Sequence, residues 1–510
     1  MDRKWWTLLS VCVATFMLLI DVTIVNVALP DIQRDLGASL SSLQWVVDAY
    51  ALTLASFLLV LGSIGDRLGR RRVFSIGFGV FVVASALCGL AGDPTLLNFA
   101  RGLQGIGAAA MFATALALIA QEFEGRERAN AIGIWGATVG GAVAIGPLVG
   151  GVLTETLGWE WIFFVNVPIG LGAIALTERK LVNVKATDAQ PIDVGGLLTF
   201  SAGLFLLIFG LIRGNAEGWG SPVIVACLGG AALLLAAFVA IELRSRHAML
   251  DLSLFRRPSF TGVSLVAFCL SAGMFAMFLY LTLYVQDILR YSPLEAGLIF
   301  LPLTVLSFIV APLSARLSDR IPFRALMGTG LFLTGIGLVL MGGIEAGDGW
   351  TKLLPGFLLA GAGIGMTNPG IASVAIGVVE PARAGMASGI NSTFRQAGIA
   401  TGVAALGAIF QSRVASELGN SLPQAPEAFS EAVSAGATEA ALASVPASFQ
   451  SQAAAAADQA FISGLNEILI FGAVVAIAGG LASWLLVRSR DMVGAPEAPG
   501  HPADDPVPTT

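Results

Sequence analysis

Charged residues are scarce in this chain. Asp, Glu, Lys and Arg together make up 12% of its 510 residues, whereas 56% are hydrophobic, and the mean hydropathy is +0.82. A soluble domain of ordinary composition carries about 25% charged residues, so the composition excludes this class and indicates an integral membrane protein. The net charge of −6 says little about partners, because the placement of charge matters more than its sum in a membrane protein.

Histidine and cysteine are also rare. His247 and His501 lie outside the long apolar runs, which excludes a histidine proton relay inside the membrane. The four cysteines stand alone in apolar runs without the spacing of metal ligands, and we interpret them as small hydrophobic residues: Cys12, Cys88, Cys227 and Cys269. The sequence contains no nucleotide-binding P-loop, zinc-spaced cluster or nucleophile elbow. We therefore expect neither an enzyme nor a primary pump, and no cofactor, metal or nucleic-acid partner.

Long apolar runs are abundant. A helix that spans a bilayer needs about 20 mostly apolar residues. We predict an all-α integral membrane protein with fourteen transmembrane helices, at 7–29, 44–65, 73–92, 95–120, 130–157, 160–177, 193–212, 222–243, 259–286, 294–316, 324–344, 352–377, 385–411 and 460–487.

The basic residues predict how these helices are oriented. With a cytoplasmic N-terminus, most of the 28 Lys and Arg residues fall in cytoplasmic segments, as the positive-inside rule requires. An even number of helices then places both termini in the cytoplasm, and we predict a location in the cytoplasmic membrane. Arg101 and Arg395 fall inside helices, and the outer segments hold Arg34, Arg213, Arg290, Lys352 and Arg413.

Two similar loops indicate an internal duplication. The loop after the tenth predicted helix contains Asp319 and Arg320, and the loop after the second contains Gly62, Asp66, Arg67, Gly69 and Arg70. Each loop joins the second and third helices of a six-helix set. Internal repeats of this kind are typical of secondary transporters, whose substrate site lies between the halves. We predict an N-terminal half at 1–190, two inserted helices at 191–245 and a C-terminal half at 246–490.

Two segments are not predicted to cross the membrane. Residues 413–459 are rich in Ala, Ser, Glu and Gln, and we expect an outer loop that forms short helices or stays mobile. Residues 491–510 are rich in Pro, Ala and Asp, and we expect a disordered cytoplasmic tail.

Asp21 is a carboxylic acid inside the first apolar run. Such a residue costs about 2.5–3.5 kcal/mol on insertion scales, so it usually serves a function. We interpret Asp21 as a proton carrier, and a hydrogen-bonded structural acid is the alternative. Arg101 lies in the fourth helix, and Asp21 is its best partner by depth. This arginine belongs either to a proton relay or to a static structural pair.

Other polar residues within the predicted helices are candidates for a substrate cavity: Asn26, Asp48, Gln104, Asn391, Arg395 and Glu467. Alternatives stay open for several of them. Asp48 lies near the outer surface and can be a solvated helix end, and neighbouring polar groups can satisfy Glu467. The patch around Arg395 can be structural.

The fifth predicted helix carries Gly146, Pro147, Gly150 and Gly151. Glycines at this spacing give a helix a face without side chains, so a neighbouring helix can approach closely. Proline in a membrane helix frees a backbone carbonyl and permits a bend. The motif therefore predicts a hinge with a tight seal, or close packing alone.

Several segments carry a family resemblance: 21–30, 62–72, 97–107, 146–151, 159–170, 283–286 and 291–297. Together they resemble the fourteen-helix drug:proton antiporter group of the major facilitator superfamily. The resemblance implies a monomeric exporter of small amphipathic or cationic compounds, driven by the proton gradient through alternating access. It further implies a relay role for Arg101 and a latch between the halves at Asp66. Glu160 departs from the group, which usually has Arg there, and the Asp319 loop lacks the glycines of its counterpart.

The sequence leaves two other functions open. One is a dedicated exporter of a single native metabolite, peptide or lipid, and the other is a membrane sensor that does not transport. Ligand-dependent proton flux separates an exporter from a sensor, because only the exporter requires it.

Overall fold

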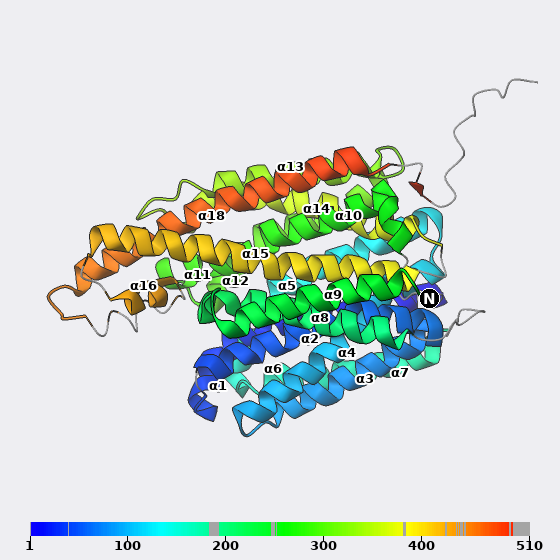
Figure 1. Ribbon diagram of the computed structural model, residues 1–510, viewed down its shortest axis with the longest axis horizontal. Coiled ribbons are helices and arrows are strands. Elements are labelled where there is room, and N and C mark those ends of the chain that lie inside the picture. Colours follow the sequence, from blue (N-terminus) through cyan, green and yellow to red (C-terminus); the bar gives the residue numbers. More distant parts are fainter. Residues whose placement is uncertain are drawn as a thin grey trace, which may run out of the picture.

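The computed structural model describes residues 2–38, 40–182, 193–245, 250, 252–380, 384–423, 426–434, 436, 438, 442, 445–488 and 491–492. Within these residues the chain forms helices joined by short turns and contains no strand (Figure 1). Thirteen of the described helices are long and apolar enough to cross a membrane. The prediction of an all-α membrane protein is confirmed.

Each of the thirteen apolar helices coincides with a predicted span. The remaining predicted span, 130–157, falls on the 33-residue helix α5, of which Leu148–Leu157 is recognised as a shorter apolar segment. The number fourteen itself therefore stays a prediction.

The predicted N-terminal half contains seven helical segments, since its sixth span is divided at Val165. They are α1 (Arg3–Leu36), α2 (Leu40–Leu68), α3 (Arg70–Gly89), α4 (Pro94–Glu122), α5 (Gly125–Leu157), α6 (Trp161–Phe164) and α7 (Asn166–Lys180). The carboxylate of Asp93 accepts hydrogen bonds from the first backbone N–H groups of α4, and Pro94 occupies the first helical position. Both are typical helix-start features, so the boundary of α4 follows from its sequence.

The rest of the chain forms two inserted helices, α8 (Val194–Glu217) and α9 (Pro222–Glu242), and the predicted C-terminal half. That half contains η1 (Leu252–Arg256), α10 (Pro258–Leu270), η2 (Ser271–Phe275), α11 (Met277–Leu283), η3 (Tyr284–Ile288), α12 (Pro293–Leu317), α13 (Phe323–Met341), η4 (Trp350–Leu353), α14 (Leu354–Gly377), α15 (Ala384–Ser421), α16 (Glu427–Ser434) and α18 (Gln450–Leu486). The predicted span 259–286 is thus an α-helix interrupted by two π-helical turns, η2 and η3.

Corresponding helices of the two halves pack in the same way. In the N-terminal half α3 meets α4, and a Cβ atom at Gly77 would lie 2.9 Å from the carbonyl oxygen of Gly107. In the C-terminal half α13 meets α14, and a Cβ atom at Gly330 would lie 2.6 Å from the carbonyl oxygen of Gly363. Between membrane helices small residues permit such close backbone approach. Both close pairs join the third and fourth helices of a half.

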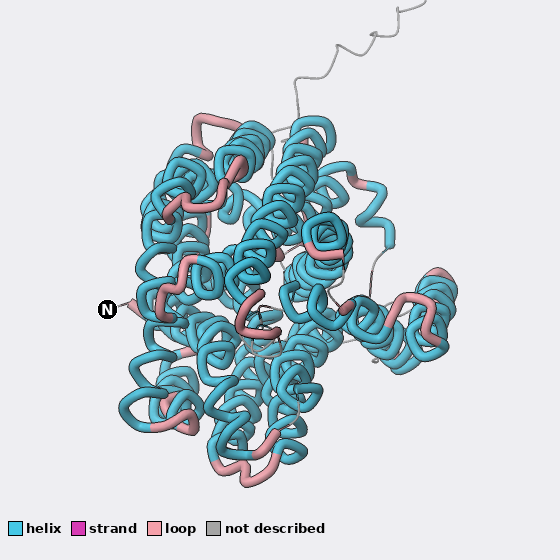
Figure 2. The backbone as a smooth tube through the Cα atoms, turned by 90° about the vertical axis from the view of Figure 1, so that its left-hand side faces the viewer, coloured by secondary structure: helices cyan, strands magenta, loops and turns pink. Residues whose placement is uncertain are grey.

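The halves meet chiefly along two helix pairs, α5 with α12 and α2 with α15, and α15 also contacts α4. The inserted helix α8 packs on α9 and contacts both α2 and α15. Large apolar side chains elsewhere point outward, among them Leu233, Leu485 and Phe99, as expected of surfaces that face lipid. Most helices run along one direction and are seen nearly end-on in Figure 2.

The predicted outer segment 413–459 is partly helical. Its first residues continue α15 as far as Ser421, and its last residues begin α18 at Gln450. The ends of these two helices and the short helix α16 project beyond the other helices, opposite the N-terminus (Figure 1). Part of this segment and all of 493–510 lie outside the described residues.

Candidate functional site

An ion pair lies inside the N-terminal half. Asp21 lies in the middle of α1, and its Oδ2 atom accepts a hydrogen bond from Nη1 of Arg101 on α4. The exposed fraction is 0% for the side chain of Asp21 and 1% for that of Arg101. The partner expected for Arg101 from depth alone is therefore the partner in the structure.

Polar groups from three helices complete the coordination of Asp21. Its Oδ1 atom accepts hydrogen bonds from Nε2 of Gln104 at 2.9 Å and from Nδ2 of Asn166 at 3.3 Å. Both amides also donate to the hydroxyl of Ser85 on α3, which in turn donates to the carbonyl of Phe163. All of these polar side chains are buried. Both carboxylate oxygens of Asp21 thus have donors.

The guanidinium of Arg101 is held on several sides. Its Nε donates to the carbonyl of Val46 at 2.8 Å, and its Nη1 also donates to Oε1 of Gln104 at 2.7 Å. The ring of Tyr50 lies 4.4 Å from the guanidinium carbon, a distance typical of a cation–π contact. The hydroxyl of Tyr50 donates to the carbonyl of Leu18 on α1. Five helices, α1, α2, α3, α4 and α7, therefore meet at this cluster.

The chemistry of this arrangement depends on charge balance. A buried ion pair is tolerated when the charges compensate each other and the remaining polar atoms are hydrogen-bonded, as they are here. If Asp21 binds a proton, its charge disappears and with it most of the attraction that holds Arg101. The cluster can therefore convert a protonation event into a change of contacts between α1 and α4. In this structure the side chain of Asp21 is fully buried, and its hydrogen-bond partners all belong to its own half.

The other acidic candidates lie apart from this cluster. Asp48 is half-buried on α2 and Glu467 is half-buried on α18. The carboxylate of Glu467 lies 3.6 Å from Nε of Arg413, and this arginine also donates to Ser463. The neighbours of Glu467 thus include a cation that the sequence placed in an outer loop. The side chain of Asn26 lies outside the described residues.

A second polar cluster lies in the C-terminal half. Nη1 of Arg395 on α15 donates to Oδ1 of Asn368 on α14 at 3.0 Å. The guanidinium carbon lies 5.6 Å from the centroid of the Phe275 ring. Asn391 lies one turn earlier on α15 and is 3% exposed. The structure therefore brings two of the predicted cavity residues, Asn391 and Arg395, onto neighbouring turns of one helix.

Asp66 joins the two halves. Its Oδ1 accepts from Nε of Arg70 at 2.9 Å, and its Oδ2 accepts from the backbone N–H of Met386 at 2.9 Å. Met386 is in the first turn of α15, where N–H groups lack intrahelical partners and the helix dipole favours negative charge. A carboxylate of the N-terminal half thus caps a helix of the C-terminal half.

The rest of the predicted gating loop shapes the turn around Asp66. Gly69 separates α2 from α3 with φ 102°, a conformation that favours glycine. Arg70 also donates to the carbonyl of Ala117 on α4. Gly62 is buried within α2, and Arg67 lies in its last turn. The turn thereby holds Arg70 and Asp66 against each other.

The glycine motif of α5 lies against α1. A Cβ atom at Gly146 would collide with the side chain of Thr23, and one at Gly150 would lie 2.9 Å from Cγ1 of Ile24. At Gly151 a Cβ atom would meet nothing within 4 Å. Two of the motif's glycines therefore permit close approach to the helix that carries Asp21. The side chain of Pro147 lies outside the described residues.

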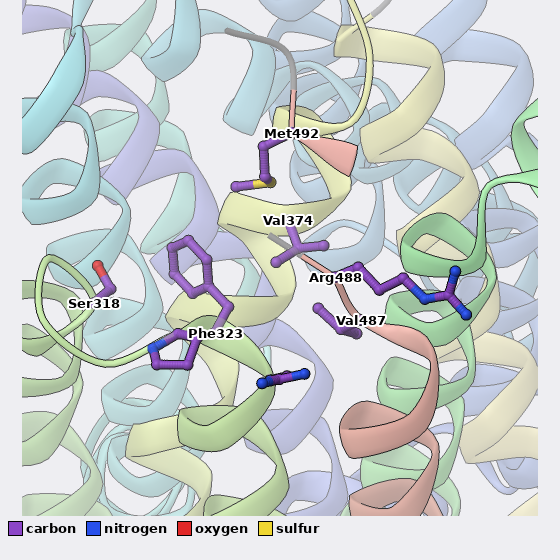
Figure 3. A pocket seen from close by; sticks show the side chains of 8 residues that line it. Ser318, Phe323, Val374, Val487, Arg488 and Met492 are labelled. Carbon is purple, nitrogen blue, oxygen red and sulfur yellow. The ribbon is translucent and has the colours of Figure 1, made fainter. Parts of the chain in front are cut away.

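A small pocket lies in the C-terminal half, beside the end of α18. It is lined by Ser318, Phe323, Val374, Val487, Arg488 and Met492, among others (Figure 3). In Figure 3 the guanidinium of Arg488 points away from Phe323 and Ser318. The pocket belongs to a different half from the Asp21 cluster.

Sequence reasoning missed several members of the Asp21 cluster. Asn166 was noted only as part of a motif, although an amide in a predicted span is a signal of a polar contact. Ser85 and Tyr50 gave no signal, because such residues are common in membrane helices. Cys88 was interpreted as a hydrophobic residue, but its thiol lies 3.7 Å from Oε1 of Gln104 as a donor.

Comparison with known proteins agrees with this architecture. The family model of the Major Facilitator Superfamily matches residues 11–403. The tetracenomycin C resistance and export protein of Streptomyces glaucescens is 34% identical over 94% of this chain and 91% of its own length. A puromycin resistance protein of Streptomyces alboniger is 36% identical over 96% of this chain and 92% of its own length.

A solved structure supports the fold. The human organic anion transporter MFSD10 aligns over 95% of this chain and 100% of its own with a TM-score of 0.62. The sequence identity is 14%, so this likeness concerns the fold alone. The match over most of the chain and the similarity to relatives confirm the family expected from the sequence motifs. The chain belongs to the Major Facilitator Superfamily and is a multi-pass membrane transporter.

Proposed function

We propose that this protein is a proton-coupled exporter of drugs or other amphipathic compounds, acting as an antiporter by alternating access. The observation that carries the proposal is the enclosed Asp21–Arg101 pair. Among the described residues, the carboxylate of Asp21 is the only acidic group that forms an ion pair with Arg101. Relatives over nearly the full length of the chain are an export and resistance protein for tetracenomycin C and a puromycin resistance protein.

Coupling between proton entry and substrate export follows if Arg101 and a proton compete for the carboxylate of Asp21. When Asp21 is charged it holds Arg101 and ties α4 to α1, and the cluster is closed. When a proton enters, the tie weakens and the contacts of α4 can rearrange. In each cycle this proton passes to the cytoplasm while a substrate leaves the cell. The transporter thus exchanges a proton for a substrate, and the proton gradient supplies the energy. No cofactor takes part in this scheme.

Alternating access needs a contact between the halves that opens and closes. The hydrogen bond from the Met386 N–H to Asp66 joins α2 to the start of α15, and we assign it the role of a latch at the cytoplasmic side. The close contact of α5 with α1 at Gly146 and Gly150 supports a seal against leakage. The protein acts in this scheme as a monomer in the cytoplasmic membrane, with both termini in the cytoplasm.

The test uses everted membrane vesicles from cells that express the chain and from cells that lack it. The vesicles are acidified by respiration, and a panel of toxic cations and antibiotics is added. A substrate of an antiporter releases protons from the vesicle lumen, so a fluorescent pH probe reports it directly. Resistance of the same cells to the active compounds gives an independent readout.

Each result bears on the proposal. Substrate-dependent proton release together with resistance supports it. Resistance without proton release contradicts the coupling but keeps export, and the absence of both across the panel contradicts drug export and favours a dedicated exporter or a sensor.

A further inference from the structure

Arg395 is a cation in the apolar bundle that no carboxylate pairs with in the part of the chain that the structure describes. Its described contacts are one hydrogen bond, to Oδ1 of Asn368 at 3.0 Å, and the ring of Phe275 at 5.6 Å. An arginine carries five N–H donors in a fixed fork. The contacts with protein groups thus use only a small part of the hydrogen-bond donors of this guanidinium. Arg101 differs, because Asp21 neutralises it.

An unused donor lies on the adjacent turn. Asn391 precedes Arg395 by four residues, so both side chains lie on the same face of α15. Asn391 is 3% exposed, and its Nδ2 atom has no hydrogen-bond partner among the described residues. A buried donor without a partner costs about 1–3 kcal/mol. A ligand that brings an acceptor to this face would offset that cost.

The cluster lies where the two halves meet. Asn368 lies on α14, and its Cβ is 3.9 Å from the position that a Cβ atom at Gly136 of α5 would take. The helix that carries Arg395, α15, packs against α2 and α4 of the other half. Arg395 itself is half-buried, so its side chain is not completely enclosed by protein. In secondary transporters substrates bind at this interface, near the middle of the membrane.

Aromatic rings adjoin the cation. Phe275 and Phe278 are both half-buried, and their ring centroids are 6.1 Å apart. Phe278 in turn lies 5.7 Å from the ring of Phe300. Phe275 is the last residue of the π-helical turn η2, and π-helical turns frequently occur at functional sites. The guanidinium of Arg395 therefore lies at one end of a row of aromatic rings formed by Phe275, Phe278 and Phe300.

We propose that Arg395, Asn391 and Asn368 form a subsite for the acidic group of an aromatic substrate, a carboxylate or a phenolate, with Phe275 and Phe278 packing on its rings. Arg395 binds the anion through its fork, and Asn391 donates a further hydrogen bond. This inference rests on the proposed function of small-molecule export and names a substrate class for it. Cationic compounds that the same protein exports would not use this subsite.

The experiment measures binding to the purified full-length protein in detergent, apart from transport. The probes are 2-naphthoate, which is ionised at pH 7, and 2-naphthamide, which has the same rings and no charge. The ratio of their two dissociation constants is determined for the wild type, Arg395→Gln and Arg395→Lys. We expect the wild type to prefer naphthoate, and the preference to fall about tenfold or more in Arg395→Gln, the effect of one charged hydrogen bond. Arg395→Lys should keep part of the preference.

Arg324→Gln is the matched control, because Arg324 is an exposed arginine of the same half that lines the small pocket near the end of α18 instead of the Arg395 cluster. Its ratio should equal that of the wild type. The ratio is measured within one sample, so a smaller folded fraction does not change it. A wild type that does not distinguish the two probes, or an Arg395→Gln variant that keeps the preference, overturns the inference. Proton release on addition of cationic drugs tests the proposed function separately and can succeed when this inference fails.

Discussion

At the scale of single residues, the burial of Asp21 and Arg101 makes their charges interdependent. Both side chains are enclosed, and each supplies the charge that compensates the other. Removal of one partner from a buried pair costs about 3–5 kcal/mol, whereas replacement of both by well-packed hydrophobic residues of similar volume is often neutral. Stability and coupling can therefore be separated by choosing single or double variants.

Coupling should depend on the carboxylate of Asp21. Asp21→Asn keeps the size of the side chain and one acceptor for Gln104 and Asn166, but it cannot cycle a proton. We expect substrate-dependent proton release in everted vesicles to fall to the level of vesicles without the protein. The double variant Asp21→Asn/Arg101→Gln removes both charges and should be equally uncoupled while it folds well. Proton release by either variant would show that another residue carries the proton.

Thermal stability should follow charge balance at the same pair. Arg101→Ala leaves an uncompensated carboxylate and should be the least stable, with a loss of about 3–5 kcal/mol. Arg101→Lys keeps the charge but loses the planar fork, so an intermediate stability is expected. The double variant Asp21→Asn/Arg101→Gln should lie nearest to the wild type. Melting temperatures of the purified proteins in detergent give the order, and equal stability of Arg101→Ala and the double variant would contradict it.

At the scale of helices, close packing of α5 on α1 positions the helix that carries Asp21. A Cβ atom at Gly150 would lie 2.9 Å from Cγ1 and 3.1 Å from the carbonyl oxygen of Ile24. A branched side chain at Gly150 must therefore push the two helices apart.

Gly150→Val should destabilise the protein by about 1–3 kcal/mol, the usual cost of overpacking, and should weaken export. Gly151→Val is the matched control for stability, because a Cβ atom at Gly151 meets nothing within 4 Å and the change in helix propensity is the same. The difference in melting temperature between the two variants measures the packing term. A loss of the same size in both would mean that propensity alone explains it.

At the scale of the whole molecule, the halves are joined by α5 with α12 and by α2 with α15. The carboxylate of Asp66 reinforces the second pair through the N–H of Met386. A hydrogen bond to a charged group contributes about 1.5–3 kcal/mol, enough to shift a two-state equilibrium about tenfold or more. The latch is therefore expected to bias which side of the transporter is open.

Asp66→Ala should increase the population in which this end of the bundle is open by about tenfold. Spin labels on exposed cysteines introduced at Leu68 and Glu380, one in each half, report the opening as a longer distance, in a chain whose native cysteines are replaced. Asp93→Ala, which removes helix-capping hydrogen bonds within the N-terminal half, should leave the distance distribution unchanged. Equal distributions for Asp66→Ala and its parent would remove the latch role.

The fold followed largely from hydropathy. A membrane forces each spanning segment to satisfy its own backbone hydrogen bonds, so apolar runs of sufficient length become helices. The predicted spans accordingly coincide with the observed helices. The extensions of α15 and α18 beyond their predicted ends were missed because these stretches are too polar to register as spans, although Ala, Gln and Glu favour helices.

The sequence by itself determined that Asp21 and Arg101 are buried and need partners, because an uncompensated charge in an apolar run is costly. Only the tertiary structure decided which side chains meet them. Lipid-facing and protein-facing surfaces of a membrane helix are both apolar, so hydropathy does not reveal which face of α1 points to α4. For the same reason the sequence could not show that Ser85, Asn166 and Tyr50 join the Asp21 cluster. Nor could it show that Glu467 lies apart from this cluster, beside Arg413.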